Sequence, residues 1–286
     1  MVYKINNVYN LHVNTIVYKM SYRIKQIPEK DFPESLRELP QPPKELFFIG
    51  QKPDPKNKLL CVVGSRRYTQ YGAEACKSII NGLAGYPITI VSGLALGIDS
   101  IAHTAALSAG LQTIAVPGSG LDSSVLYPRS HVNLAKQIIE SDGGLYSEFK
   151  PGQKAAPWTF PQRNRIMAGL SDAILVIEAE EKSGTLITSR LATEYNKDVL
   201  AVPGSIFSAQ SKGPHMLIKL GATPITSSTD IIEHFGWDDI NSQPGVQLLA
   251  KLTEGEKQVF DLITEPISHN DLIRLSPLPT PETQAI

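Results

Sequence analysis

The chain has 286 residues, 42% of them hydrophobic, which is enough for one large folded domain with small appendages. Its formal net charge of -1 excludes a general positive field for nucleic acid, so any anion site must be a local cluster. Two cysteines, Cys61 and Cys76, make neither a disulfide framework nor a zinc quartet, and we expect a reduced, cytoplasmic protein. No apolar run approaches the roughly 20 residues of a membrane-spanning helix, so we expect no membrane partner.

Residues 1–45 are predicted to be an N-terminal extension and an extended lead-in, since prolines recur between Pro28 and Pro43. Residues 46–237 show a regular alternation of strands and helices. Apolar strand runs are expected at 46–50, 59–63, 88–91, 112–116, 144–147, 172–177, 198–202 and 223–225. Helices are expected near 71–84, 98–109, 131–141, 163–170, 184–196 and 214–220. Apolar strands separated by helices predict an α/β fold with a doubly wound, mostly parallel sheet.

The polar stretch 238–252 is predicted to be a linker to a C-terminal tail, 253–286. The tail begins with a helical pattern in which Thr253 caps and Glu256 stands at the capping-box position. The tail is therefore expected to be a small helical unit.

Small-residue turns follow several of the predicted strands. In an open parallel sheet these turns share one edge, where ligands bind. Because glycine lacks a Cβ, backbone N–H groups in such turns approach phosphates closely. The turns are Gly64-Ser65-Arg66, Ser92-Gly93-Leu94, Pro117-Gly118-Ser119-Gly120, Lys182-Ser183-Gly184-Thr185 and Pro203-Gly204-Ser205. Their number favours an extended polyanion over a single nucleotide.

The turn after the first strand does not have the dinucleotide-binding spacing. Gly64 is followed by Ser65-Arg66-Arg67 instead of G-x-G-x-x-G, and the second strand ends in Ser92-Gly93 without an acidic residue for a ribose. The sequence has no G-x-x-x-x-G-K-[ST] loop, which argues against an ATPase. Arg66 and Arg67 together favour an anion site over a purely structural turn.

Two further segments are candidates for binding a nucleic-acid strand. The first segment, at the start of a predicted helix, is expected to bind a phosphate through Lys182, Ser183, Gly184 and Thr185. The alternative is that Ser183 or Thr185 is an ordinary N-cap of that helix. The segment 158–165 places aromatic rings beside guanidinium groups, which suits stacked bases and phosphates. The candidate residues of this segment are Trp158, Phe160, Arg163, Asn164 and Arg165. Arg129, which follows Tyr127-Pro128, is a similar but weaker candidate. A solvated helix start with core aromatics is the alternative.

Asp99 and His103 are four residues apart on a predicted helix. We interpret them as a local pair, with Asp99 favouring the helix N-terminus and His103 pairing with it, and not as catalytic residues. No serine or cysteine nucleophile with a partnered base stands out, and we expect no catalytic residue, metal or cofactor.

Taken together, these motifs resemble the bacterial DprA/Smf family, DNA-processing protein A, from about Asp31 to about Gly236. The matching stretches are VVGSRRYTQYG (62–72), VSGLALGIDSIAH (91–103), TIAVPGSGLDSSVLYP (113–128), FPQRNRIMAGLSDAILVIEA (160–179), SGTLITSRLATE (183–194) and VPGSIF (202–207).

The resemblance implies an extended Rossmann-like domain that binds single-stranded DNA, protects incoming strands in natural transformation and loads RecA recombinase onto them. It also implies a homodimer and DNA contacts from Arg66 and the basic residues of the rim. The chain departs from the family pattern at both ends. Too little precedes Asp31 for a complete N-terminal helical domain, and 253–286 resembles a winged helix that stops before the wing.

The principal alternative is a nucleotide phosphoribohydrolase of the lysine-decarboxylase-like Rossmann group, whose motif is P-G-G-x-G-T-x-x-E. Here Thr188 stands where that glutamate would be, and Pro-Gly-Gly is absent before Gly184. A hydroxyl does not replace a carboxylate as a base. A nucleotide sensor without catalysis is the third alternative.

Overall fold

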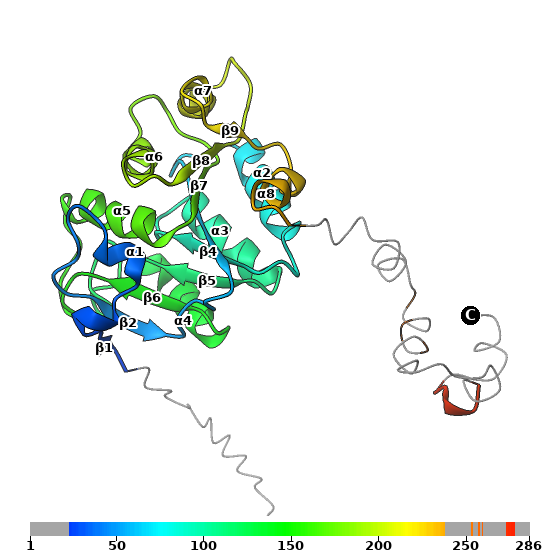
Figure 1. The fold of residues 1–286 in the computed structure, drawn as a ribbon, viewed down its shortest axis with the longest axis horizontal. Helices are drawn as coiled ribbons and strands as arrows, with labels where there is room; N and C mark the ends of the chain where they lie inside the picture. The colour runs from blue at the N-terminus through cyan, green and yellow to red at the C-terminus, as the bar shows by residue number, and fades with distance from the viewer. Residues whose placement is uncertain (1–22, 238–252, 254–256, 258, 260–272, 278–286) are drawn as a thin grey trace, which may run out of the picture. The chain divides into compact units, whose positions relative to one another are not determined.

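The computed structural model describes residues 23–237, 253, 257, 259 and 273–277 (Figure 1). The chain divides into two compact units, Met1–Pro224 and Ile225–Ile286. Within the described residues, no helix has both the length and the apolar character that crossing a membrane requires. The predicted linker and tail lie almost entirely outside this part of the chain, as does the predicted capping of the helix at 253–265.

A nine-stranded sheet forms the centre of the first unit, in the order β1-β2-β6-β5-β4-β3-β7-β8-β9 (Figure 1). The strands from β3 to β9 are parallel, whereas β2 is antiparallel to both β1 and β6. The strands are β1 (Lys25–Gln26), β2 (Phe47–Gly50), β3 (Lys58–Val63), β4 (Ile88–Ser92), β5 (Gln112–Ala115), β6 (Gly144–Ser147), β7 (Ala173–Val176), β8 (Asp198–Ala201) and β9 (Thr223–Pro224).

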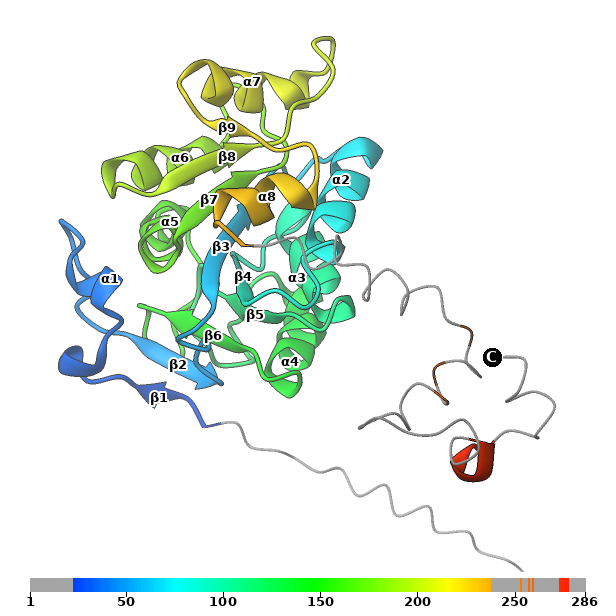
Figure 2. The ribbon, with the colours of Figure 1, turned by 45° about the vertical axis from the view of Figure 1, so that its right-hand side comes forward.

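Helices cover both faces of the sheet (Figure 2). The helices α2, α3 and α4 pack together on one face, and α1, α5 and α6 pack on the other. The α-helices are α1 (Glu34–Arg37), α2 (Gln70–Asn81), α3 (Ile98–Ser108), α4 (Val132–Glu140), α5 (Thr159–Leu170), α6 (Thr185–Glu194), α7 (Lys212–Lys219) and, in the second unit, α8 (Ser228–His234). Short 3₁₀ helices span Glu29–Asp31, Arg129–His131 and Ala209–Ser211. The predicted doubly wound, mostly parallel α/β fold is confirmed.

The central strands are mostly apolar because both faces of the sheet are covered. Leu60, Ile90 and Leu175 are each 0% exposed. Helix α5 begins at Thr159, four residues before its predicted start. Pro161 lies in the first turn of this helix, where its missing N–H leaves no helical hydrogen bond unmade.

The lead-in is part of the same core. Residues Lys25–Gln26 pair with β2, and the chain then crosses the face that carries α5. Leu36 and Leu39 are buried in a cluster with Met167 and Leu170 of α5. A Cβ at Gly169 would lie 2.7 Å from Leu39, so the glycine allows this close packing.

The order β5-β4-β3-β7-β8-β9 contains one reversal of direction, between β3 and β7. From β3 the chain builds the sheet outward through β4, β5 and β6, and it then returns to start β7 on the other side of β3. The loops that follow β3 and β7 therefore leave in opposite directions and open a crevice at the carboxyl edge. This crevice positions the candidate site.

Candidate nucleic-acid interface

The turn after β3 is packed tightly against the start of α3. Ser65 is buried, and its Oγ accepts a hydrogen bond from the Arg67 amide at 3.0 Å. The Ile98 amide donates to the Ser65 carbonyl at 3.3 Å. A Cβ at Gly64 would lie 2.6 Å from the Ile98 side chain, so a larger residue does not fit. The turn is thus fixed from beneath and presents Arg66 and Arg67 to solvent.

Arg66 lies against an aromatic ring from α5. Its guanidinium carbon is 5.3 Å from the centroid of the Phe160 ring, which is cation–π distance. Phe160 in turn contacts Tyr127 at 5.7 Å between ring centroids and covers Gly118, where a Cβ would lie 2.6 Å from the ring. A cation and two rings thus share one edge. Trp158, predicted beside them, is 57% exposed and packs edge-on against Phe149.

The loop after β7 forms the opposite wall. Helix α6 begins at Thr185 with Gly184 as its N-cap residue, and no side chain caps it there. Ser183 Oγ accepts from the Thr185 amide at 3.2 Å, and Thr185 Oγ1 donates to the Gly64 carbonyl at 3.1 Å. That second bond ties the two walls together across the reversal between β3 and β7.

Between these walls lies a cleft of about 490 Å³, which we call the Arg66 cleft. The predicted site residues that line it are Gly64, Ser65, Arg66, Arg67, Phe160, Arg163, Asn164, Ser183, Gly184 and Thr185. Its other lining residues are Val63, Ala95, Asp99, Pro161, Met167, Glu180, Ile187 and Thr188. Sequence patterns did not single out Glu180 or Ile187 as site residues. Only their position could have indicated a role in the site, because both residues follow β7 at the point where the strand order reverses.

Arg163 lies at the floor of the cleft and is only 4% exposed. Its Nη1 donates to the Gly93 carbonyl at 2.6 Å and also to the Val116 carbonyl, which joins the ends of β4 and β5. Asp99 Oδ2 accepts from the Gly93 amide at 3.1 Å beside it. Burial raises the pKa of Asp99, and the charge of Arg163 opposes that shift. Burial likewise lowers the pKa of Arg163, which Asp99 opposes. Arg163 thus shapes the cleft from below.

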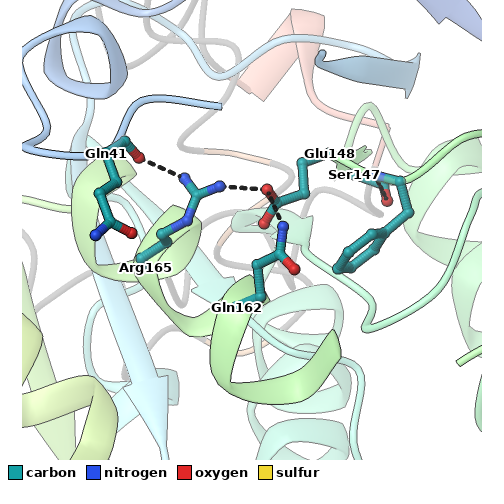
Figure 3. A network of polar contacts seen from close by, with 6 residues as sticks. Gln41, Ser147, Glu148, Gln162 and Arg165 are labelled. Atoms are coloured by element: carbon teal, nitrogen blue, oxygen red, sulfur yellow. Dashed lines mark hydrogen bonds and ion pairs between the residues drawn. The ribbon is translucent and has the colours of Figure 1, made fainter. Parts of the chain in front are cut away.

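Arg165, also predicted as a DNA contact, is held in another network (Figure 3). Its Nη2 forms an ion pair with Glu148, and its Nη1 donates to the Gln41 carbonyl at 2.8 Å. Gln162 donates to the same Glu148 oxygen at 2.9 Å. Arg165 joins the lead-in to α5 and does not line the Arg66 cleft.

The two remaining predicted cations also lie outside the Arg66 cleft. Nη1 of Arg129 donates to the carbonyls of Ser123 and Ser124, both at 3.1 Å. Lys182 is exposed and lines a neighbouring hollow beside α6 and α7. The structure therefore brings together most of the predicted site and separates Arg129, Arg165 and Lys182 from its centre.

The predicted pairing of Asp99 with His103 is wrong. His103 Nδ1 contacts Thr113 Oγ1 at 2.7 Å, and Asp99 turns instead toward the Gly93 amide and Arg163. One helical turn separates the two residues, but α3 is buried and the stronger partners come from β5 and α5.

Burial raises the pKa of Cys61 and brings that of Cys76 to about 12, which keeps both thiols protonated. Within the described residues, no group of His, Cys, Asp or Glu side chains has the arrangement of a metal site.

The model of the family described as DNA recombination-mediator protein A matches residues 23–236. This chain belongs to that family. It is 41% identical over 203 residues to protein Smf of Escherichia coli, and this alignment covers 71% of this chain and 54% of that protein. It is 43% identical over 204 residues to DNA processing protein DprA of Streptococcus pneumoniae, covering 71% of each. The chain spans about half the length of the Escherichia coli relative.

Solved structures of this family share the fold. The crystal structure of DprA from Streptococcus pneumoniae matches with a TM-score of 0.69 and 40% identity, covering 77% of this chain and 76% of that one. DNA processing protein A from Helicobacter pylori, described for its single-stranded DNA binding mode, matches with a TM-score of 0.66 and 28% identity. That match covers 75% of this chain and 96% of that one. The resemblance predicted from the motifs is confirmed.

Proposed function

We propose that this chain is a non-enzymatic, cytoplasmic recombination mediator. It binds single-stranded DNA, protects incoming strands during natural transformation and loads RecA recombinase onto them. One observation carries the proposal. The Arg66 guanidinium lies against the Phe160 ring at the mouth of a cleft whose walls are small-residue turns. A cation beside an aromatic face accommodates a phosphate and a stacked base of the same strand.

In this proposal Arg66 and Arg67 neutralise phosphates, and the Gly184 N–H adds a contact from the opposite wall. Asn164 lines the same cleft and supplies a polar side chain. A base stacks on Phe160. Lys182 and Arg129 lie farther along the edge and attract the strand on either side. Phosphate contacts carry no base identity, so the sequence preference is small.

The test is a fluorescence anisotropy titration with labelled oligo-dT. Arg66→Ala weakens binding at least tenfold at low salt and lowers the slope of log affinity against log salt by about 0.7, the single-strand value for one phosphate contact. Arg37→Ala is the matched control, because Arg37 is an exposed arginine on α1 that does not line the cleft. Equal affinities for the Arg66→Ala and Arg37→Ala variants would contradict the placement.

The RecA partner is tested separately from DNA binding. The wild-type protein is expected to accelerate assembly of RecA on strands that are already coated with single-strand-binding protein. A protein that binds DNA but leaves assembly unchanged is a passive binder and not a mediator. We also propose a homodimer, which sedimentation at several protein concentrations tests directly.

The absence of hydrolase activity is a proposal with its own support. Thr188 lines the Arg66 cleft and is 1% exposed, so the position of the expected glutamate carries a buried hydroxyl. A hydroxyl with its ordinary proton does not act as a carboxylate base. Incubation with nucleoside monophosphates, followed by chromatography, is expected to release no free base. Free base formed in proportion to enzyme would overturn this part.

A further inference from the structure

The turn that follows β8 holds two apolar side chains in solvent. Phe207 is 93% exposed and Ile206 is 76% exposed. Full burial of such side chains stabilises a protein by about 1.5–3 kcal/mol each, and contiguous exposed apolar surface marks an interaction site. The Arg66 cleft does not include either residue. Their exposure therefore needs an explanation of its own.

The turn is fixed by hydrogen bonds on both sides. Tyr71 Oη donates to the Pro203 carbonyl at 2.5 Å, and His215 Nε2 lies 3.0 Å from the Gly204 carbonyl. Within the turn, the Ser208 amide donates to the Ser205 carbonyl at 3.0 Å. The start of the turn, at Pro203 and Gly204, is thus held by two helices, α2 and α7, and the Phe207 amide lies 3.3 Å from Ser205 Oγ within the turn. Exposure of the Phe207 ring is a built feature of this edge.

The turn is adjacent to the proposed DNA site through Tyr71. A Cβ at Gly204 would lie 3.5 Å from the Tyr71 ring, so ring and turn are in contact. Tyr71 is 50% exposed and lies in the first turn of α2, four residues after Arg67. Four residues span at most about 14 Å between Cα atoms. A strand that contacts Arg67 therefore reaches Tyr71 within a few nucleotides.

We infer that Tyr71, Ile206 and Phe207 form a second base-stacking subsite for single-stranded DNA that leaves the Arg66 cleft past Arg67. This inference rests on the proposed function. The occupant is argued from composition and position. Tyr71 follows the exposed Arg67 by four residues, and Phe207 precedes the exposed Lys212 by five. Exposed aromatic rings with cations close by in the chain suit unpaired bases on a charged backbone. The subsite lengthens the stretch of DNA that one protomer holds without adding base specificity.

The test compares oligo-dT of increasing length by anisotropy at low salt. With the wild-type protein, affinity rises with length until the oligonucleotide fills both the Arg66 cleft and the subsite. Phe207→Ala is expected to remove the gain for the longer oligonucleotides, weakening them about fivefold or more, and to leave the shortest ones unchanged. Phe207→Trp keeps a ring, and it is expected to retain affinity and to show tryptophan quenching beyond that of the wild-type protein with the long oligonucleotides only.

Two controls separate the outcomes. Leu275→Ala removes a comparably exposed apolar side chain, 61% exposed, and is expected to change nothing. Arg66→Ala weakens short and long oligonucleotides alike. Unchanged length dependence in Phe207→Ala, while Arg66→Ala weakens binding, overturns the subsite and leaves the proposed function intact. A change in self-association for Phe207→Ala, with unchanged DNA affinity per protomer, also overturns it and assigns the turn to contact between copies. If neither Phe207→Ala nor Arg66→Ala weakens DNA binding, both proposals are contradicted.

Discussion

Glu178 accepts two hydrogen bonds from Thr69, one from the hydroxyl at 2.6 Å and one from the amide at 2.8 Å. Thr69 Oγ1 in turn accepts from the Gly72 amide at 3.2 Å and caps α2. A carboxylate at the end of β7 thereby holds the helix that starts after β3. Because Arg66 and Arg67 lie on the loop between β3 and this cap, the bond fixes one wall of the Arg66 cleft.

Replacement of Glu178 by alanine is expected to lower the free energy of unfolding by about 3 kcal/mol, the loss of hydrogen bonds to a buried charged group. Urea denaturation measures it. DNA affinity is expected to fall as well, since the loop that carries Arg66 loses its anchor. Glu74→Ala is the control, because Glu74 is exposed on α2 and accepts a hydrogen bond from Gln70 of the same helix. A Glu178→Ala protein as stable as this control would rule out the anchoring role.

Gly72 is expected to be intolerant of a side chain because of the same carboxylate. A Cβ there would lie 2.3 Å from Glu178 Oε2. Gly72→Ala is therefore expected to destabilise the protein by about 1–3 kcal/mol, the usual cost of overpacking a core. In a Glu178→Ala background the same substitution is expected to cost less, which a double-mutant cycle measures. If the two substitutions change the free energy of unfolding additively, the cost of Gly72→Ala does not come from a clash with Glu178.

Arg163 and Asp99 are expected to behave as a coupled buried pair. Arg163→Met leaves Asp99 without its buried cation and is expected to lower the free energy of unfolding by about 3–5 kcal/mol. Asp99→Asn with Arg163→Met removes both charges and is expected to recover part of that loss. Denaturation of the single and double variants measures the coupling. If the double variant is as unstable as the sum of the two single ones, the pair has no mutual stabilisation.

Arg165 is expected to contribute to stability more than to DNA binding. Burial raises the pKa of Glu148, and the Arg165 charge opposes that shift. Arg165→Ala therefore leaves a carboxylate that ionises unfavourably in the folded protein, so its destabilisation is expected to be greater at neutral pH than at mildly acidic pH. Adding Glu148→Gln is expected to restore stability at neutral pH. A large loss of oligo-dT affinity in a fully folded Arg165→Ala protein would show that Arg165 contributes directly to DNA binding.

His103 gives stability a dependence on pH. Burial lowers its pKa to about 3, against 6.5 for the ordinary group. The folded protein holds the ring neutral while the unfolded chain binds a proton below about pH 6.5. The contribution of His103 is therefore present above that pH and is lost as the pH falls toward 3. Wild-type protein is expected to lose stability between pH 7 and pH 5 more steeply than His103→Gln. Parallel curves from urea denaturation would contradict this.

Local sequence patterns were sufficient for the parts of the fold that depend on one segment at a time. The strand runs, the helices between them and the turns of glycine and serine were predicted because burial on both faces requires continuous apolar strands. The same patterns gave ten residues of the Arg66 cleft, since small residues and arginines after strands are visible without a structure. The family also follows from motif order alone.

The partners of buried titratable side chains depend on tertiary structure. His103 faces β5 and not Asp99, Arg163 faces the ends of β4 and β5, and Arg165 faces Glu148. In the sequence these titratable side chains look alike. Only packing separates a guanidinium that donates to buried carbonyls, such as Arg163, from one that is exposed, such as Arg66. The placement of α5 over the reversal between β3 and β7 decides that distinction, because burial selects the nearest acceptor for each cation.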